Sequence, residues 1–203
     1  MKFDELNQLK AFYSTMQIPE EDKKKRVDLA LELYDVFLYI LFFMDAEMRT
    51  QLDVEKIVEG ISEGTVEDIK ESLTLRLEDT LRGKPIEEDY IPRLVDEVVD
   101  TTLRHPEDKY YTSQERALLI AQNESNSVNN YDDFLQAKSK GFTMKQWVTE
   151  GDEKVRPEHV LVDGEKIPID AFFMVGGEQM RYPHDPTASP DNIVNCRCTL
   201  KYT

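Results

Sequence analysis

The spacing of apolar residues changes near Gly141, which indicates two kinds of secondary structure along the chain. Before Gly141, apolar residues recur every three or four positions, which is typical of amphipathic helices. After it, short β-type runs are separated by glycine and aspartate, which is typical of short strands. The sequence therefore predicts an α+β chain, with an N-terminal helical bundle followed by a long helix packed on a small antiparallel β-sheet.

The longest predicted helix covers residues 20–48, and its centre, Val36 to Met44, is apolar on all sides. A helix of this kind is expected to be covered on all sides. The apolar run is shorter than the roughly 20 residues that a membrane helix needs. Thr65 with Asp68, and Thr112 with Glu115, have the spacing of capping boxes. The other predicted helices are 4–16, 53–61, 65–81, 87–103 and 112–138.

A polar segment from Arg104 to Lys109 contains a proline, which disfavours helix in the residue before it. We expect this segment to separate domain 1–104 from domain 110–203. Trp147 and Phe172 are predicted to be core aromatics. Turns are predicted at Asp163-Gly164 and Gly176-Gly177, where glycine adopts positive φ easily. The predicted strands are 143–149, 160–162, 166–169, 172–175, 179–182 and 193–202.

The net charge of −16 argues against functions that depend on a broad basic surface, because nucleic-acid binding relies on lysine and arginine against phosphate. The one prominent basic run, Lys23 to Arg26, is expected to be a solvated helix face. The first ten residues lack the pattern of a secretory signal, so we expect the protein to stay in the cytosol where it is made.

The C-terminal part of the chain contains an ordered set of distinctive residues. Together with Glu124 on the preceding predicted helix, this set resembles the C-terminal domain of the phage Mu protein F-like minor head proteins, from about residue 113 to 203. In sequence order the set is Trp147, Asp152, Arg156, His159, Asp163, Gly164, Pro183, Asn195, Cys196, Arg197 and Cys198.

The resemblance implies a minor head protein of a tailed phage or prophage, which is a head-morphogenesis role without enzymatic activity or cofactor. It implies attachment to the portal protein during procapsid assembly, contacts with scaffold or capsid proteins and packaged DNA, and an influence on DNA packaging or ejection. The expected location is the interior of the virion head, and the host cytoplasm during assembly. We expect the acidic first half, with its apolar run 36–44, to be the portal-facing or self-associating part.

Glu124 falls within an apolar stripe of the predicted helix 112–138. A buried carboxylate needs a partner, because an unpaired buried charge is very costly. A structural ion pair with Arg156, Arg181, Arg197 or His159 is the simpler interpretation. The alternative is an acid–base set of Glu124, His159 and an arginine that would cut RNA. That alternative would make the chain a small nuclease effector delivered by the phage.

Cys196 and Cys198 alternate with polar residues and are predicted to lie on the apolar face of the last strand. Core packing of two reduced thiols is the simpler interpretation. Zinc binding by Cys196 and Cys198 with His159 or His184 is the alternative, although the Cys-x-Cys spacing is tighter than that of the usual zinc knuckle.

A third class remains open from composition alone: an acidic cytosolic inhibitor that masks a basic enzyme. The C-terminal residue set argues against it. Because the chain ends shortly after Cys198-Thr199-Leu200, no appended toxin domain is expected.

Overall fold

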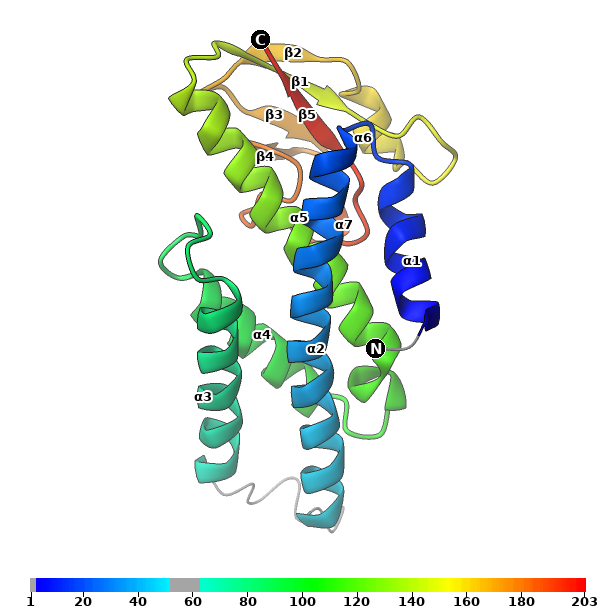
Figure 1. Ribbon diagram of the computed structural model, residues 1–203, viewed down its shortest axis with the longest axis vertical. Coiled ribbons are helices and arrows are strands. Elements are labelled where there is room, and N and C mark those ends of the chain that lie inside the picture. The colour runs from blue at the N-terminus through cyan, green and yellow to red at the C-terminus, as the bar shows by residue number, and fades with distance from the viewer. Residues whose placement is uncertain (1–2, 52–62) are drawn as a thin grey trace. The chain divides into compact units, whose positions relative to one another are not determined.

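The computed structural model describes residues 3–51 and 63–203, with the side chains of 4–45 and 66–203 among them. This part of the chain is α+β, as predicted (Figure 1). No helix within it is long and apolar enough to cross a membrane. The elements in chain order are α1 (Phe3–Ser14), α2 (Glu20–Gln51), α3 (Glu63–Thr80), α4 (Tyr90–Leu103), the 3-10 turn η2 (Lys109–Thr112), α5 (Gln114–Ser139), β1 (Met144–Val148), α6 (Pro157–Leu161), β2 (Lys166–Pro168), β3 (Phe173–Val175), β4 (Glu178–Met180), α7 (Pro190–Ile193) and β5 (Thr199–Tyr202).

The chain forms two compact units. One unit combines Met1–Ala30 with Gln122–Thr203, and the other is Leu31–Ala121. We call these the α/β unit and the helical unit. α2 begins in the α/β unit and ends in the helical unit, and α5 begins in the helical unit and ends in the α/β unit. In the sequence, the two units therefore do not meet at the segment 104–109.

The helical unit is held together by apolar side chains of α2, α3 and α4. The expectation that the run 36–44 is covered on all sides is wrong in part. Tyr39 is 51% exposed and Phe42 is 45% exposed, and the Arg76 guanidinium lies 4.4 Å from the centre of the Tyr39 ring. The remaining face of the run is buried, because a helix packed against neighbours on one side buries only part of its circumference. Its buried residues are Val36, Phe37, Ile40, Leu41 and Met44.

Several predicted helix starts are displaced in the structure. α3 begins at Glu63, so Thr65 lies inside the helix and is not its N-cap. The cap of α5 is Ser113, whose Oγ accepts a hydrogen bond from the backbone N–H of Arg116 at 3.2 Å, while Thr112 ends η2. α4 begins at Tyr90, three residues after the predicted start. The predicted helix 53–61 lies outside the described residues.

Two small antiparallel sheets replace the single predicted sheet. The first has the strand order β2-β1-β5, with Trp147 opposite Leu200 and Lys145 opposite both Ile167 and Tyr202. The second is the hairpin β3–β4. Its turn confirms the predicted glycine pair, since Gly176 has φ 58° and Gly177 has φ 83°. Positive φ at both central residues matches the right-handed twist of the strands that flank such a turn.

One predicted strand, the first part of another and one predicted core residue are wrong. Residues 160–162 belong to or follow α6, in which Pro157 occupies a first-turn position that suits proline. Residues 193–198 do not extend β5, because α7 ends at Ile193 and Asn195 has φ 59°, which interrupts an extended backbone. Phe172 is 48% exposed, and its neighbour Phe173 is the buried aromatic.

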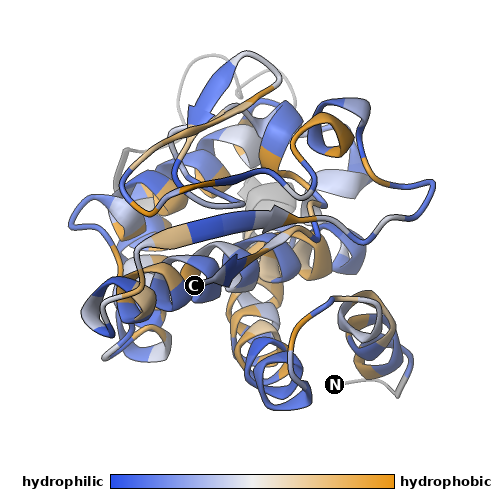
Figure 2. Cartoon of the chain, turned by 90° about the horizontal axis from the view of Figure 1, so that it is seen from above, coloured by the Kyte–Doolittle hydropathy of each residue, from blue (hydrophilic) through white to orange (hydrophobic). Residues whose placement is uncertain are grey.

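Within the α/β unit, α5 lies against the strands, as predicted (Figure 1). Phe134 and Ala137 of α5 share a core with Ile169 and Tyr182. Most helices carry apolar and hydrophilic residues on the same ribbon, as expected for helices with one buried face (Figure 2). A second core surrounds Trp147 and contains Val162, Phe173, Val175, Met180, Ala188, Cys196 and Cys198.

The basic run at the start of α2 is only partly a solvated face. Arg26 is 1% exposed, and its Nη2 donates to Asp133 Oδ2 and to Asn130 Oδ1, each at 3.0 Å. Lys25 Nζ donates to Asp132 Oδ2 at 2.7 Å. The basic run therefore helps to join α2 to α5 inside the α/β unit.

Candidate functional site

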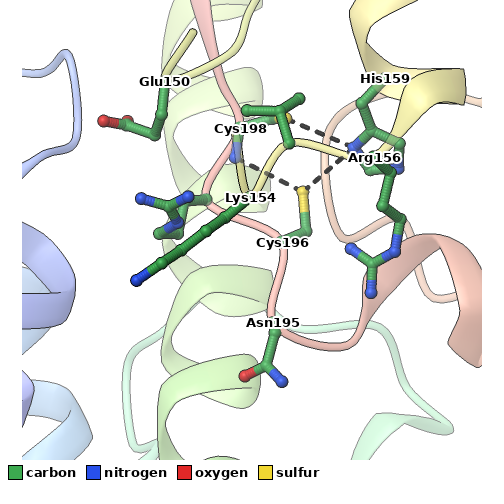
Figure 3. Close-up of a pocket in the computed structure, with 9 residues that line it drawn as sticks. Glu150, Lys154, Arg156, His159, Asn195, Cys196 and Cys198 are labelled. Carbon is green, nitrogen blue, oxygen red and sulfur yellow. Dashed lines mark hydrogen bonds between the residues drawn. The ribbon is translucent and has the colours of Figure 1, made fainter. Parts of the chain in front are cut away.

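A pocket of the α/β unit lies over two cysteines and a histidine (Figure 3). The histidine, His159, comes from α6, and Cys196 and Cys198 come from the segment between α7 and β5. All three side chains are buried, with exposures of 1%, 3% and 4%. The pocket is lined by Glu150, Lys154, Val155, Arg156, His159, Asn195, Cys196, Arg197 and Cys198.

The Nδ1 atom of His159 lies between the two sulfur atoms. It is 3.4 Å from Cys198 Sγ and 3.6 Å from Cys196 Sγ. The ligand atoms of the three residues all lie within 4.8 Å of one another. Cysteine sulfur and histidine nitrogen are ligands that zinc favours. The structure thus brings together the three residues that the zinc alternative named.

The contact between the two cysteines shifts their pKa values in opposite directions. The contact with Cys198 lowers the pKa of Cys196 well below its usual value, and contacts with both His159 and His184 lower it further against the effect of burial. The same contact and burial raise the pKa of Cys198.

Arg197, which lines the pocket, is paired with Asp152. Arg197 Nη2 donates to Asp152 Oδ1 at 2.7 Å, and the backbone N–H of Lys154 donates to the same oxygen at 3.0 Å. The hydrogen bond from Arg197 lowers the pKa of Asp152, and the pairing raises the pKa of Arg197. Arg197 Nη1 also donates to Thr15 Oγ1 at 3.1 Å, which connects this pair to the turn after α1.

Arg156 and Asn195 fix the backbone just before the cysteines. The Arg156 guanidinium donates through Nη2 to the carbonyl oxygen of Val194. Asn195 has φ 59°, a left-handed conformation that asparagine tolerates better than most residues. Its backbone N–H donates to Asn123 Oδ1 at 2.9 Å. These contacts turn the chain so that Cys196 and Cys198 both face His159.

Asp163 and Gly164 form a turn, but not the predicted hairpin turn, because a helix precedes them. Asp163 Oδ1 accepts from the backbone N–H of Thr149 at 2.8 Å. Gly164, with φ 76°, donates its N–H to the Trp147 carbonyl at 2.9 Å. The pair therefore ties the end of α6 to β1.

Trp147 is fully buried, as predicted. Its ring meets the His159 ring edge to face, with centroids 5.7 Å apart, and meets Phe173 in the same way at 5.2 Å. Edge-to-face packing of this kind fixes ring orientation in a core. Trp147 thus supports the imidazole from the side of the sheet.

A polar face of α5 binds the backbone of the segment that leads to the cysteines. Asn126 Nδ2 donates to the Cys196 carbonyl at 3.3 Å, and Asn130 Nδ2 donates to the Pro183 carbonyl at 3.0 Å. Ser127 Oγ donates to the His184 carbonyl at 3.2 Å. Buried backbone carbonyls in an irregular segment need such donors, because no strand partner supplies them.

His184 and Asp185 complete this support. His184 Nε2 donates to the Cys196 carbonyl at 2.7 Å. Asp185 is fully buried and accepts from the Arg181 guanidinium through Nε at 2.8 Å and Nη2 at 3.0 Å. Burial alone would raise the pKa of Asp185, but hydrogen bonds from Arg181 and Thr187 lower it below its usual value.

Every residue of the ordered C-terminal set therefore has a place in one unit, around one buried cluster. A family model described as Phage Mu protein F like protein matches residues 54–201, well over half of the chain. The chain belongs to the phage Mu protein F-like family. Membership suggests a phage head-morphogenesis protein. No curated protein and no solved structure shows a significant match to it.

The Mu F-like match is wider than the resemblance expected from the motif residues, which began near residue 113. It includes α3 and α4. The helical pattern of this earlier part contains few distinctive polar residues, so inspection of motifs did not reveal it.

Glu124 is only half-buried, and it is not among the residues that line the pocket of this Mu F-like protein. His159 Nδ1 faces the two sulfur atoms. The guanidinium groups of Arg156 and Arg197 bind Val194 and Asp152. The acid–base set of the nuclease alternative therefore has no geometric support in this pocket.

The residues that hold the segment before the cysteines were not predicted from the sequence. A signal existed for those on α5, where Asn123, Asn126, Ser127 and Asn130 recur at helical spacing. Asparagines in a helix interior are unusual enough to indicate side chains that bind backbone groups elsewhere. Asp185 and Lys145 gave no comparable signal, because their burial depends on contacts that are distant in sequence.

Proposed function

We propose that this Mu F-like protein is a minor head protein of a tailed phage, that it attaches to the portal protein during procapsid assembly, and that it remains inside the head. Family membership over residues 54–201 is the observation that supports this most directly. In this proposal the protein acts by binding other proteins. The host cytoplasm is its location before assembly.

The roles of the motif residues support an assembly function. Asp152, Arg156 and Arg197 bind backbone and side-chain groups of their own unit. Asn195 shapes the backbone. Motif residues used in this way hold the fold of the unit together. A stable fold is what a structural component of a virion requires.

The net charge of −16 supports protein contacts over direct contact with packaged DNA. We propose the helical unit as the portal-facing part, because Tyr39 and Phe42 expose aromatic surface on the apolar run of α2. Exposed aromatic residues are frequent at protein–protein interfaces. The negative net charge of the chain favours a basic patch on the portal.

The first test is quantitative mass spectrometry of purified DNA-filled particles from the phage that encodes this chain. We expect the protein at a low and reproducible ratio to portal protein. Its absence from filled particles, with abundant protein in the host cytosol, would contradict the proposed place in the virion head.

A second test asks whether the exposed aromatic residues of α2 form the portal-binding surface. Full-length protein with Tyr39→Ser and Phe42→Ser should lose capture by purified portal protein. Leu161→Ser is the matched control, because Leu161 is 85% exposed but belongs to α6 of the α/β unit. Equal capture of both variants would contradict the proposed portal surface.

A further inference from the structure

We propose that His159, Cys196 and Cys198 bind one zinc ion, with His159 Nδ1 and the two Sγ atoms as protein ligands and a water molecule on the pocket side as the fourth. This inference does not depend on the head role, because it rests on the geometry of three buried side chains within one unit (Figure 3).

The distances agree with tetrahedral zinc. Zinc lies about 2.3 Å from a thiolate sulfur and about 2.0–2.1 Å from a histidine nitrogen, so a tetrahedral angle separates nitrogen from sulfur by about 3.6 Å. The measured separations from His159 Nδ1 are 3.4 Å to Cys198 Sγ and 3.6 Å to Cys196 Sγ. An ion therefore fits between the three atoms with little movement of the chain.

Core packing alone explains the histidine poorly. His159 is 1% exposed. Within the described residues, the polar contacts of its ring are those of Nδ1 with two sulfur atoms. Cysteine sulfur is a weak hydrogen-bond partner, so contacts with two sulfur atoms satisfy a buried imidazole nitrogen poorly. A metal ion bonded to all three atoms satisfies that nitrogen more fully.

The surroundings hold the three ligands in place from several elements. Trp147 packs edge to face on the imidazole of His159. The Cys196 carbonyl accepts hydrogen bonds from His184 and Asn126, and the backbone N–H of Cys198 donates to Cys196 Sγ at 3.4 Å. Outer contacts of this kind orient ligands and donate to metal-bound sulfur.

The charge of the site and its access from solvent are also suitable for zinc binding. Binding replaces the two thiol protons, so Zn²⁺ with two thiolates and a neutral imidazole has no net charge, and two protons are released to solvent. Nearby cations therefore do not oppose the loaded site. Arg156 and Arg197 are held by Val194 and Asp152, and the pocket beside the sulfur atoms gives the ion a route of entry and room for a water ligand.

The ion would stabilise the fold of the α/β unit. It joins α6 to the segment before β5, where the described structure has no strand pairing. A ligand that binds only the folded state stabilises it in proportion to the logarithm of its concentration over its dissociation constant. Zinc should therefore raise the melting temperature of the full chain.

The test uses full-length protein, purified under reducing conditions without chelator, and elemental analysis. We expect one zinc per chain, removed by a strong chelator and restored by zinc alone. Cys196→Ser with Cys198→Ser should abolish the stoichiometric zinc. His105→Gln is the matched control, because His105 stacks on Tyr111 in the helical unit and should leave the zinc content unchanged.

Substitution with cobalt identifies the metal ligands by spectroscopy in the wild-type chain, so the test does not depend on the folding of a variant. Chelator-treated wild-type protein loaded with Co²⁺ should show a thiolate-to-metal charge-transfer band and the strong visible bands of a tetrahedral ion, and zinc should displace both. Failure of the reduced wild-type chain to take up stoichiometric zinc, or a cobalt spectrum without a thiolate band, would overturn the proposal and leave a core of two thiols.

Discussion

Arg26 Nη2 donates to Asp133 Oδ2 at 3.0 Å and thereby joins the first turns of α2 to the later part of α5. The arginine side chain is 2% exposed and the aspartate side chain 32% exposed. Asn130 and Asn126 provide further acceptors for the same guanidinium group. Residues more than one hundred positions apart in sequence are thus fixed to each other inside one unit.

Asp133→Ala should destabilise the protein by about 2–3 kcal/mol, because it leaves a buried guanidinium without its counter-charge. Chemical denaturation measures the change. Asp79→Ala is the control, since it removes an ion pair with Arg82 in which both side chains are more than 70% exposed. An exposed pair of this kind contributes less than about 1 kcal/mol. Equal effects of the two variants would refute the structural importance of the Arg26 pair.

Asp185→Asn should destabilise the protein by about 2–3 kcal/mol at neutral pH, because the buried carboxylate accepts charge-assisted hydrogen bonds from Arg181. The pKa of Asp185 lies below its usual 3.8 in the folded state. Its stabilising contribution is therefore complete above about pH 4–5 and is lost as pH falls through the folded pKa. The free energies of unfolding of wild type and variant should converge as the pH falls. A difference between them that stays constant down to low pH would contradict this.

Lys145 is fully buried among Phe134 and Phe173, and its Nζ donates to the Arg181 carbonyl at 2.7 Å. Burial lowers its pKa from 10.5 to about 8. In that interval the unfolded chain binds more protons than the folded one, so this group makes stability rise with pH.

Relative to Lys145→Met, the wild-type free energy of unfolding should increase between about pH 8 and pH 10.5, by up to about 3 kcal/mol. Denaturation of both proteins at matched pH values measures the difference, and titrations common to both proteins cancel. A difference that is independent of pH would show that Lys145 keeps an ordinary pKa.

Asn195→Val should destabilise the protein by about 1–2 kcal/mol, because the left-handed backbone at φ 59° is strained for a β-branched residue. Asn195→Gly should have little effect on stability, since glycine adopts this conformation freely. Thermal or chemical denaturation of the pair tests the explanation. If both variants lose the same stability, the side chain of Asn195 and not its backbone conformation is the reason for asparagine there.

Much of the fold could be predicted from local patterns. The helical spacing of the first 139 residues located α1, α2, α4 and α5 to within a few residues, and the glycine pair at 176–177 located the β3–β4 turn. Errors occurred where local signals conflict. Val160 to Val162 has strand-forming residues but lies in or beside a short helix that starts at a proline, and Asn195 interrupts the run that seemed to continue into β5.

The burial of polar residues could not be predicted in the same way. Arg26 belongs to a run of four basic residues, yet it alone of that run is almost completely buried. The sequence offers no local difference between Arg26 and its neighbours that would reveal this. The partners that stabilise it, Asn130 and Asp133, come from a helix about one hundred residues later.

The α+β class and the membership in the Mu F-like family could be inferred without a structure, because helical periodicity, turn residues and motif order are all local or linear properties. The meeting of His159 with Cys196 and Cys198, and the association of residues 1–30 with the C-terminal unit, became evident only from the folded chain. Such contacts depend on the folding of distant segments against one shared core, and no local pattern encodes which side chains will meet there.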